Sequence, residues 1–443
     1  EVLFLKATAG GSKMSSTFDD DEEDVRPSNN LNESKGDIQE FKMLDDDDDD
    51  DDEAGTSKRA EAKGKPSKSS SAEAAETSEA TSTINNNVSG AVQPLEAILK
   101  KHPNNYKALE RIISLLRRLG RLEEVPTYLD AAKNNDGRST THAGYHYCQG
   151  LHARYTNDVG KAIVEFNMAR RDESWGADAL VAMIELYLNP NQDGAWEERE
   201  AGPMDDAMSN NLSAASVLLK ELKPLVHSGT TASTNSGVNQ LKYQVLENYY
   251  LLATRIKSNI EKVMQSFIAM LEDDGDYLPA VLGMATGFMV EKNSHKARNL
   301  LKRVAKLEPS RHDGEDFIKA NLLLAKFYVD KAKYDQAQDL CKRTLNQNKS
   351  SSQAWEILGL VMEKEQSYDK AAECYERAWK LEFEASAPVG FKLAFCYIKA
   401  KPARYVEAID VCEKVLAQFP DYPRIKEEIL RKCMEGLKCG EAK

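Results

Sequence analysis

The sequence predicts an all-α protein, an α-solenoid in which antiparallel helix pairs stack into a right-handed superhelix, preceded by a disordered acidic segment. Three observations predict this architecture. From about residue 89, apolar side chains recur at helical spacing. Similar units of about 34 residues follow one another along the same stretch. The first fifth of the chain instead combines acidic runs with little apolar surface, which is typical of disorder.

The acidic segment holds the whole charge imbalance of the protein. Residues 1–90 contain 10 basic and 23 acidic side chains, whereas residues 91–443 contain 49 of each, so the formal charge of −13 belongs to the first fifth. Acidic residues gather at 19–24 and in the unbroken run Asp45–Asp52. We expect residues 1–88 to be disordered, with docking onto a basic partner surface as the alternative. A basic nucleic-acid-binding protein is excluded by this balance.

The clearest repeat unit begins at Ser352 and matches the tetratricopeptide repeat (TPR), a pair of antiparallel helices. Its small residues, Gly359 and Ala371, would let the two helices of the unit approach closely. Its bulky residues would fill the space between stacked units, so no unit could bury its apolar face alone. The signature residues of this unit are Trp355, Leu358, Gly359, Ala371, Tyr375 and Ala378.

Further copies of the unit begin at Ala143, Leu278, Ile318 and Ala387, and a weaker copy begins at Tyr106. Their signature residues are Gly150, Ala162, Phe166, Ala297, Ala325, Ala337, Ala394, Tyr397, Ala408 and Pro420. One bulky position of the second helix can be followed through the array, at Leu95, Leu129, Phe166, Leu219, Phe267, Leu301, Cys341, Tyr375 and Cys412. Larger spacings fall at loop-like insertions, chiefly residues 189–208 and 227–239.

We therefore expect three regions: a disordered segment at 1–88, a TPR array at 89–422 and a capping helix with its tail at 423–443. The array would hold about eight units plus a leading half unit, whose lone helix packs through Ala91, Leu95 and Ile98. The partner of that helix is expected upstream, near 37–44. The capping helix carries an apolar stripe at Ile425, Ile429 and Cys433. The first helix of each unit should line the concave face.

Motifs for catalysis, nucleotides or metals are missing from the sequence, and the nearest candidate is a cluster of four residues on one predicted helix. His142 and His146 are four residues apart, which could suit a transition metal, and Cys148 and His152 follow. Packing or surface positions on a repeat helix explain these residues better, so we expect no cofactor and no metal. The seven cysteines include no C-x-x-C pair, which favours reduced thiols over a disulfide framework.

One peptide-binding mode of TPR proteins can be tested in the sequence. Co-chaperones that hold the C-terminal Glu-Glu-Val-Asp of heat-shock chaperones use Lys and Asn at positions 5 and 9 of a unit. Three units were compared with that pattern, and they carry Leu282 and Thr286, Leu322 and Lys326, and Glu356 and Leu360. None of these pairs fits, so a carboxylate clamp is not expected.

Several segments go beyond what a TPR fold requires, because they include surface and turn residues. In these segments the chain resembles the C-terminal part of the tetratricopeptide repeat protein 21 family, the long TPR subunit of intraflagellar transport complex A. The family's N-terminal array is missing here, and Glu1 is not a Met, so we expect a piece of a longer protein. The matching segments are Tyr106–Ala132, Tyr147–Leu151, Ala177–Pro190, Leu219–Pro224, Leu246–Tyr250, Pro279–Ala285, Met362–Ser367, Gly390–Ala400 and Tyr405–Val415.

The resemblance implies a scaffold without enzymatic activity, located in the cilium or flagellum, the cytoplasm and the cytoskeleton. It implies a role in retrograde ciliary transport and in ciliary entry of membrane cargo. The implied partners are the other complex A subunits and adaptors of membrane-protein cargo, without nucleic acid and without insertion into a membrane. Two alternatives stay open at this point: a general TPR adaptor that binds a peptide in its concave groove, and the TPR arm of an enzyme whose catalytic domain lies elsewhere.

Overall fold

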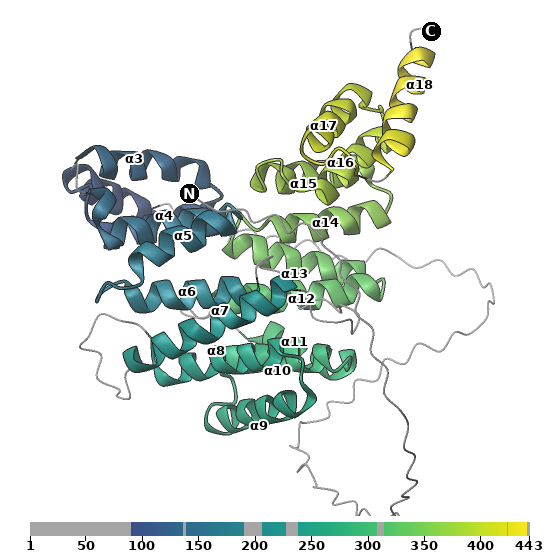
Figure 1. The fold of residues 1–443 in the computed structure, drawn as a ribbon. Coiled ribbons are helices and arrows are strands. Elements are labelled where there is room, and N and C mark those ends of the chain that lie inside the picture. Colours follow the sequence, from purple (N-terminus) through teal and green to yellow (C-terminus); the bar gives the residue numbers. More distant parts are fainter. Residues whose placement is uncertain are drawn as a thin grey trace, which may run out of the picture. The chain divides into compact units, whose positions relative to one another are not determined.

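The computed structural model describes residues 90–135, 139–189, 206–226, 238–307, 314–422 and 424–440 (Figure 1). Within these ranges the chain is a succession of helices joined by turns, without a β-sheet, as the all-α prediction requires. The predicted acidic segment at 1–88 and the helix expected near 37–44 lie outside the described residues.

The helices form eight consecutive pairs, each consisting of a helix A and a helix B. The pairs are α2 (Tyr106–Leu119) with α3 (Val125–Asn135), α4 (Ala143–Tyr155) with α5 (Val159–Ala169), α6 (Gly176–Leu188) with α7 (Asp206–Leu222), α8 (Gln240–Ala253) with α9 (Lys257–Asp273), α10 (Leu278–Val290) with α11 (Ser294–Lys306), α12 (Gly314–Asp330) with α13 (Tyr334–Gln347), α14 (Ser352–Lys364) with α15 (Tyr368–Leu381), and α16 (Ala387–Lys399) with α17 (Tyr405–Gln418). A helix at 90–101 precedes the pairs, and a π-helical segment η4 (Ile425–Leu430) and α18 (Arg431–Gly440) follow them. Short 3-10 turns lie at η1 (Leu122–Glu124), η2 (Ser139–Thr141) and η3 (Lys223–Leu225).

Close approach of helix A to helix B depends on small residues at the crossing. A Cβ atom added to Gly150 would lie 2.7 Å from the ring of Phe166, and one added to Gly359 would lie 2.8 Å from the ring of Tyr375. Both aromatic side chains are fully buried. The glycines therefore make room for the rings, and a larger residue would force the two helices apart.

The structure places most of the predicted signature residues inside the stack. Trp355 is half-buried, and its ring lies 4.5 Å from the guanidinium carbon of Arg377, which is cation–π distance. Pro420 is exposed. The others are buried: Gly150, Ala162, Phe166, Ala297, Ala325, Ala337, Leu358, Gly359, Ala371, Tyr375, Ala378, Ala394, Tyr397 and Ala408.

The turn from helix A to helix B recurs in nearly identical form. At the turn after α12, the N–H of Ala332 donates to the carbonyl of Val329 (3.0 Å) and the N–H of Lys333 donates to that of Tyr328 (2.8 Å), which is the Schellman pattern. The pattern requires one residue with positive φ. That residue is Gly120, Asn157, Arg255, Lys292, Ala332 or Gln366 in six of the pairs, with φ between 54° and 77°.

The buried apolar side chains form two clusters that meet at α8. Tyr243 and Leu246 of α8 pack into the cluster that runs from Val92 to this helix. Val245 and Leu252 pack into the cluster that continues to Cys433. Tyr249 contacts both clusters, so α8 joins the two halves of the array.

Three elements differ from the sequence-based expectation. In the leading helix, Leu95 packs against the core, but Val92 and Leu99 are buried whereas Ala91 and Ile98 are exposed, so two of the three predicted packing positions are wrong by one residue. Helix α12 begins at Gly314, four residues before the unit start predicted at Ile318. The terminal stripe Ile425, Ile429 and Cys433 is buried, but its first turn is π-helical rather than α-helical.

Candidate functional site: a charged contact between α2 and α12

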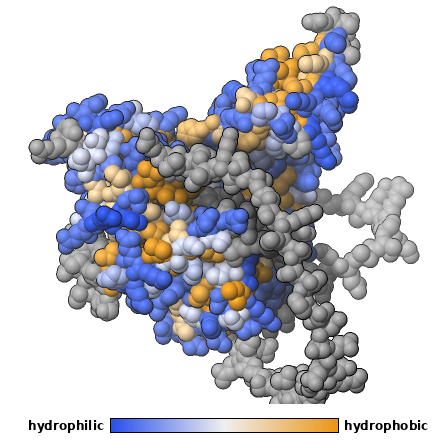
Figure 2. Space-filling model, viewed as in Figure 1, coloured by the Kyte–Doolittle hydropathy of each residue, from blue (hydrophilic) through white to orange (hydrophobic). Residues whose placement is uncertain are grey.

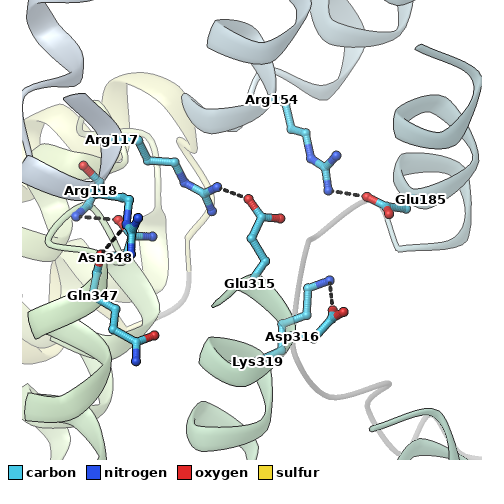
Figure 3. A network of polar contacts seen from close by, with 10 residues as sticks. Arg117, Arg118, Arg154, Glu185, Glu315, Asp316, Lys319, Gln347 and Asn348 are labelled. Atoms are coloured by element: carbon cyan, nitrogen blue, oxygen red, sulfur yellow. Dashed lines mark hydrogen bonds and ion pairs between the residues drawn. The ribbon is translucent and has the colours of Figure 1, made fainter. Parts of the chain in front are cut away.

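The early start of α12 brings its first turn against helices from the beginning of the array. Glu315 and Asp316 lie in this turn, where carboxylates are favoured by the helix dipole. Glu315 Oε1 lies 2.5 Å from Arg117 Nη1 in the last turn of α2, although 198 residues separate them in the sequence (Figure 3). Glu315, the third residue upstream of the predicted unit start at Ile318, thus forms a long-range contact.

Backbone atoms reinforce the same approach one helix further on. The N–H of Lys349, in the turn between α13 and α14, donates to the carbonyl of Arg118 (3.1 Å). Arg118 Nε donates to the carbonyl of Gln347 (3.3 Å), and Figure 3 labels both residues. Gly120 lies so close that an added Cβ would be 3.1 Å from the Cβ of Lys349. Helix α2 therefore ends directly against the α13–α14 turn.

Two further ion pairs lie beside this contact. Arg154 of α4 pairs with Glu185 of α6 at 2.6 Å, and Lys319 of α12 pairs with Asp316 at 3.3 Å (Figure 3). Burial alone would raise the pKa of Glu185, but the positive charges of Arg154 and Lys319 outweigh burial, so the pKa of Glu185 is lowered. Burial raises the pKa of Asp316, with Lys319 opposing the shift.

The pKa of Glu315 is lowered strongly. The guanidinium of Arg117 lowers the pKa of this carboxyl to about 2, against an opposing effect of burial. The side chain of Glu315 nevertheless stays 52% exposed and that of Arg117 stays 25% exposed, so solvent screens the pair. Arg117 also stacks on the ring of Tyr155, with 4.0 Å between its guanidinium carbon and the ring centroid.

The space left at this contact is small. A cavity of about 140 Å³ is bordered by Arg117, Tyr155, Glu315 and Asn348. Ligand pockets usually measure roughly 300–1,000 Å³. We therefore interpret the arrangement as a contact that ties the first helix pairs to α12–α14, and we call it the α2–α12 clasp (Arg117, Arg118, Glu315, Gln347 and Lys349).

Sequence reasoning missed the clasp, because the repeat pattern concerns packing between neighbours. The available signals were the adjacent cations Arg117 and Arg118 at the end of one helix and the adjacent carboxylates Glu315 and Asp316 before another. Nothing in their spacing indicates that they meet. The signature residues, by contrast, are distributed through the helix-pair interfaces and do not converge on a single site.

Three of the four residues of the candidate metal cluster have separate structural roles, and the fourth, His152, is half-buried on α4. His142 caps α4, its Nδ1 accepting from the N–H of Gly144 at 3.0 Å. His146 lies between Glu165 and the carbonyl of Thr140, at 2.8 Å from each. Cys148 is buried, and burial raises its pKa. Among the residues that the structure describes, no group of three or more His, Cys, Asp or Glu could hold a metal ion.

The positions compared with the carboxylate clamp lie partly in the core. Leu282 and Leu322 are buried, and the Thr286 hydroxyl, also buried, donates to the carbonyl of Leu282. The six cysteines whose side chains the structure describes are free and buried. Burial raises the pKa of the Cys341 thiol to about 12, which makes its thiolate scarce at neutral pH. No helix in the described ranges is both apolar enough and long enough to span a bilayer.

A stack of antiparallel helix pairs, held by apolar packing and tied by a charged contact, defines a repeat scaffold of the TPR type. Models of the tetratricopeptide repeat protein 21 family match two consecutive parts of the chain: the fifth ARM repeats domain at 83–188 and the C-terminal ARM domain at 214–434. The chain belongs to this family.

Individual relatives agree with the domain models. The chain is 42% identical to tetratricopeptide repeat protein 21B of Homo sapiens over 339 residues, which is 74% of this chain and 25% of that protein. It is 38% identical to tetratricopeptide repeat protein 21A of Mus musculus over 360 residues (80% and 26%). It is 30% identical to the Caenorhabditis elegans homolog over 340 residues (76% and 25%). The chain thus spans about a quarter of these relatives.

Among solved structures, the crystal structure of the APC/C hetero-tetramer Cut9–Hcn1 aligns with a TM-score of 0.44 and 14% identity, covering 75% of this chain and 58% of that one. The family and the fold are repeat scaffolds rather than enzyme families.

Proposed function

We propose that the chain is part of a non-enzymatic scaffold subunit of intraflagellar transport complex A, acting in retrograde ciliary transport and in ciliary entry of membrane cargo. The observation that carries the proposal is family membership, since two domain models match in consecutive order over most of the helical region. In this proposal the partners are other complex A subunits and adaptors of membrane-protein cargo. The protein would act at the ciliary base and axoneme and in the cytoplasm.

The ion pairs between helices and the burial of the cysteines support a scaffolding role. Several ion pairs of the described residues link helix to helix, as Arg154 links α4 to α6 and Lys392 links α16 to Glu356 of α14. The buried thiols have raised pKa values, which disfavours nucleophilic chemistry by them. The surfaces left for function are the exposed faces of the helices, which suit binding by surface burial.

The α2–α12 clasp weighs against the alternative of a general adaptor with a peptide in its concave groove. The first turn of α12 covers the end of α2 through Glu315, and the turn at Lys349 covers Arg118. A groove peptide would have to displace these contacts. We therefore keep the adaptor as the second candidate only for the helix pairs after α14.

The test is quantitative co-purification from ciliated cells. The gene product that contains this chain is tagged at its own locus, and complex A subunits are measured by mass spectrometry against an unrelated tagged TPR protein. Strong enrichment of several complex A subunits is expected. If those subunits are recovered no better than with the unrelated protein, the proposed function is wrong.

A further inference from the structure

The outward face of helix B can be compared between repeats at one equivalent position. This position lies two residues before the buried bulky residue that recurs in every helix B. Its side chain is exposed in all eight pairs. The residues there are Thr127, Val164, Val217, Gln265, Asn299, Asp339, Glu373 and Asp410.

Only α5 and α7, two successive B helices, carry an apolar residue at this position. Val164 and Val217 are 62% and 59% exposed, and Met168, one turn after Val164, is 61% exposed. The fold does not require apolar residues there, because six other B helices place polar ones at the same site. Figure 2 shows hydrophobic residues reaching the surface in the part of the view where Figure 1 places α5 to α7.

The two helices are held next to each other at this face. Arg170, just after α5, pairs with Glu221 of α7 at 3.7 Å. Arg170 lies two residues beyond Met168, and Glu221 lies four residues beyond Val217. The three apolar side chains, Val164, Met168 and Val217, therefore belong to one surface, which we call the α5/α7 strip.

Positive charges border this strip. Lys161 lies on α5 three residues before Val164, Arg171 lies in the turn after α5 three residues beyond Met168, and Lys220 follows Val217 by three. All three are exposed, and none forms an ion pair with another residue in the described part of the chain. Among the nearby carboxylates, Glu165 bonds His146 and Glu221 pairs with Arg170. Asp158 and Asp172 accept backbone N–H groups, and Glu173 is exposed beside Arg171.

We propose that the α5/α7 strip is a docking face for an amphipathic helix of another protein. The apolar side of that helix would cover Val164, Met168 and Val217, and carboxylates flanking it would pair with Lys161, Arg171 and Lys220. Charge complementarity selects this occupant, because an apolar line bordered by unpaired cations matches a helix with an apolar face and acidic margins. The inference concerns a surface outside the clasp and stands whichever complex the protein joins.

The test uses the full chain and a defined probe. The probe is a fluorescein-labelled synthetic helix with Leu on one face and Glu along both margins, and a second probe carries Lys in place of Glu. Binding is followed by fluorescence anisotropy. The test variant is Val164→Gln with Val217→Gln, which installs the residue that α9 has at this position. The matched control is Asn299→Gln with Glu373→Gln, at the equivalent exposed sites of α11 and α15.

The chain should bind the Glu-margin helix more tightly than the Lys-margin helix. The Val164→Gln, Val217→Gln variant should bind it at least about tenfold more weakly, a loss equivalent to roughly 1.4 kcal/mol. The control should bind like the unmodified chain. Because the substitutions are exposed, urea unfolding should be nearly unchanged in both variants.

Three results would overturn the proposal. The first is equal affinity of the unmodified chain and the test variant, or no binding of the Glu-margin probe. The second is binding to vesicles of phosphatidylserine and phosphatidylcholine that the test variant loses, which would make the strip a membrane face. The third is self-association that the test variant abolishes in sedimentation experiments, which would assign the strip to a second copy of the chain.

Discussion

At the scale of single residues, the crossing of helix A and helix B can be tested at Gly359. The repeat spacing predicted a small residue here, and the structure leaves 2.8 Å between an added Cβ and the ring of Tyr375. We expect Gly359→Ala to lower the free energy of unfolding by about 1–3 kcal/mol, because the buried ring cannot yield without repacking. Urea unfolding measures the loss. Gly90→Ala, where no atom lies within 4 Å, is the control and should leave stability nearly unchanged.

A second residue has no counterpart in the repeat pattern. Asn321 of α12 is 1% exposed, and neither its Oδ1 nor its Nδ2 has a hydrogen-bond partner among the described residues. A buried amide left unsatisfied costs on the order of 1–3 kcal/mol. We expect Asn321→Leu to raise the free energy of unfolding by about 1 kcal/mol, whereas Asn299→Leu, at an exposed position of α11, changes little. A loss of stability in Asn321→Leu would mean that a bound water satisfies the amide.

At this scale the sequence predicts packing positions from spacing and size. Positions such as Phe166, Ala337 and Ala378 combine helical spacing with a size that only one place in a helix pair accepts. The structure buries all three. Residues such as Asn321 could not be foreseen, because a polar residue on a helix leaves open which neighbours surround it.

At the scale of the element, the turn between helices A and B can be improved. Ala332 adopts φ 56°, a left-handed conformation that costs a non-glycine residue about 1–2 kcal/mol. We expect Ala332→Gly to raise the free energy of unfolding by about 0.5–1 kcal/mol, as glycine adopts this conformation freely. The matched control is Ala131→Gly, on the exposed side of α3, which should lower stability by about the same amount. If both variants lost stability alike, the left-handed turn would carry no strain.

Replacing glycine by alanine in the turn after α2 should lower the free energy of unfolding. Gly120 has φ 77° and lies against Lys349. Gly120→Ala combines left-handed strain with a Cβ only 3.1 Å from another Cβ, so we expect a loss of about 1–2 kcal/mol in thermal or urea unfolding. A variant as stable as the parent would argue against the close approach of α2 to the α13–α14 turn.

Element boundaries were harder to predict than residue roles. The unit at Ile318 is a good repeat start by spacing, yet α12 gains a turn at Gly314–Phe317, because Glu315 and Asp316 favour a helix N-terminus and Glu315 meets the distant Arg117. In the leading helix the prediction placed Ala91 in the core, whereas Val92 is buried there. A helix with only one covered face can bury either residue with nearly the same spacing. Tertiary contacts determine both the start of α12 and the buried face of the leading helix, and the local spacing of residues does not contain them.

At the scale of the whole array, the α2–α12 clasp should respond to acid. The carboxyl of Glu315 has a pKa of about 2 in the folded protein against an ordinary value of 4.5. A lowered folded pKa means that the pair stabilises the fold above about pH 4.5 and that this contribution disappears as pH falls toward 2. We expect the unmodified protein to lose more stability over this range than Glu315→Gln, by a modest amount because the pair is solvent-screened.

The clasp can be separated from general stability by a distance measurement. Fluorophores on α2 and α12 should move apart in Glu315→Gln and in high salt, because screening weakens a half-exposed pair. Glu356→Gln is the control, since it removes the ion pair between α14 and α16 that joins neighbouring pairs only. Equal distances in all three proteins would show that the backbone bond of Lys349 holds the contact without Glu315.

The succession of helix pairs along the array could be predicted from the sequence. The contact between α2 and α12 could not. Each repeat packs largely within itself and on its sequence neighbours. Gly150 lies against Phe166, and Gly359 lies against Tyr375, each in one unit. Arg117 and Glu315 belong to units five steps apart, and their meeting depends on how small rotations accumulate along the stack.

The clasp also has a mechanical consequence. A stack in which every pair touches only its neighbours lengthens like a spring when its ends are pulled. Here the hydrogen bond from Lys349 to Arg118 and the ion pair of Glu315 with Arg117 connect α2 directly to α12–α14. A pulling force is therefore divided between these contacts and the helix pairs that lie between them in the sequence. Extension of this stretch is limited until these contacts rupture, and the spacing between anything fastened to α2 and anything fastened to α14 is held nearly constant under load.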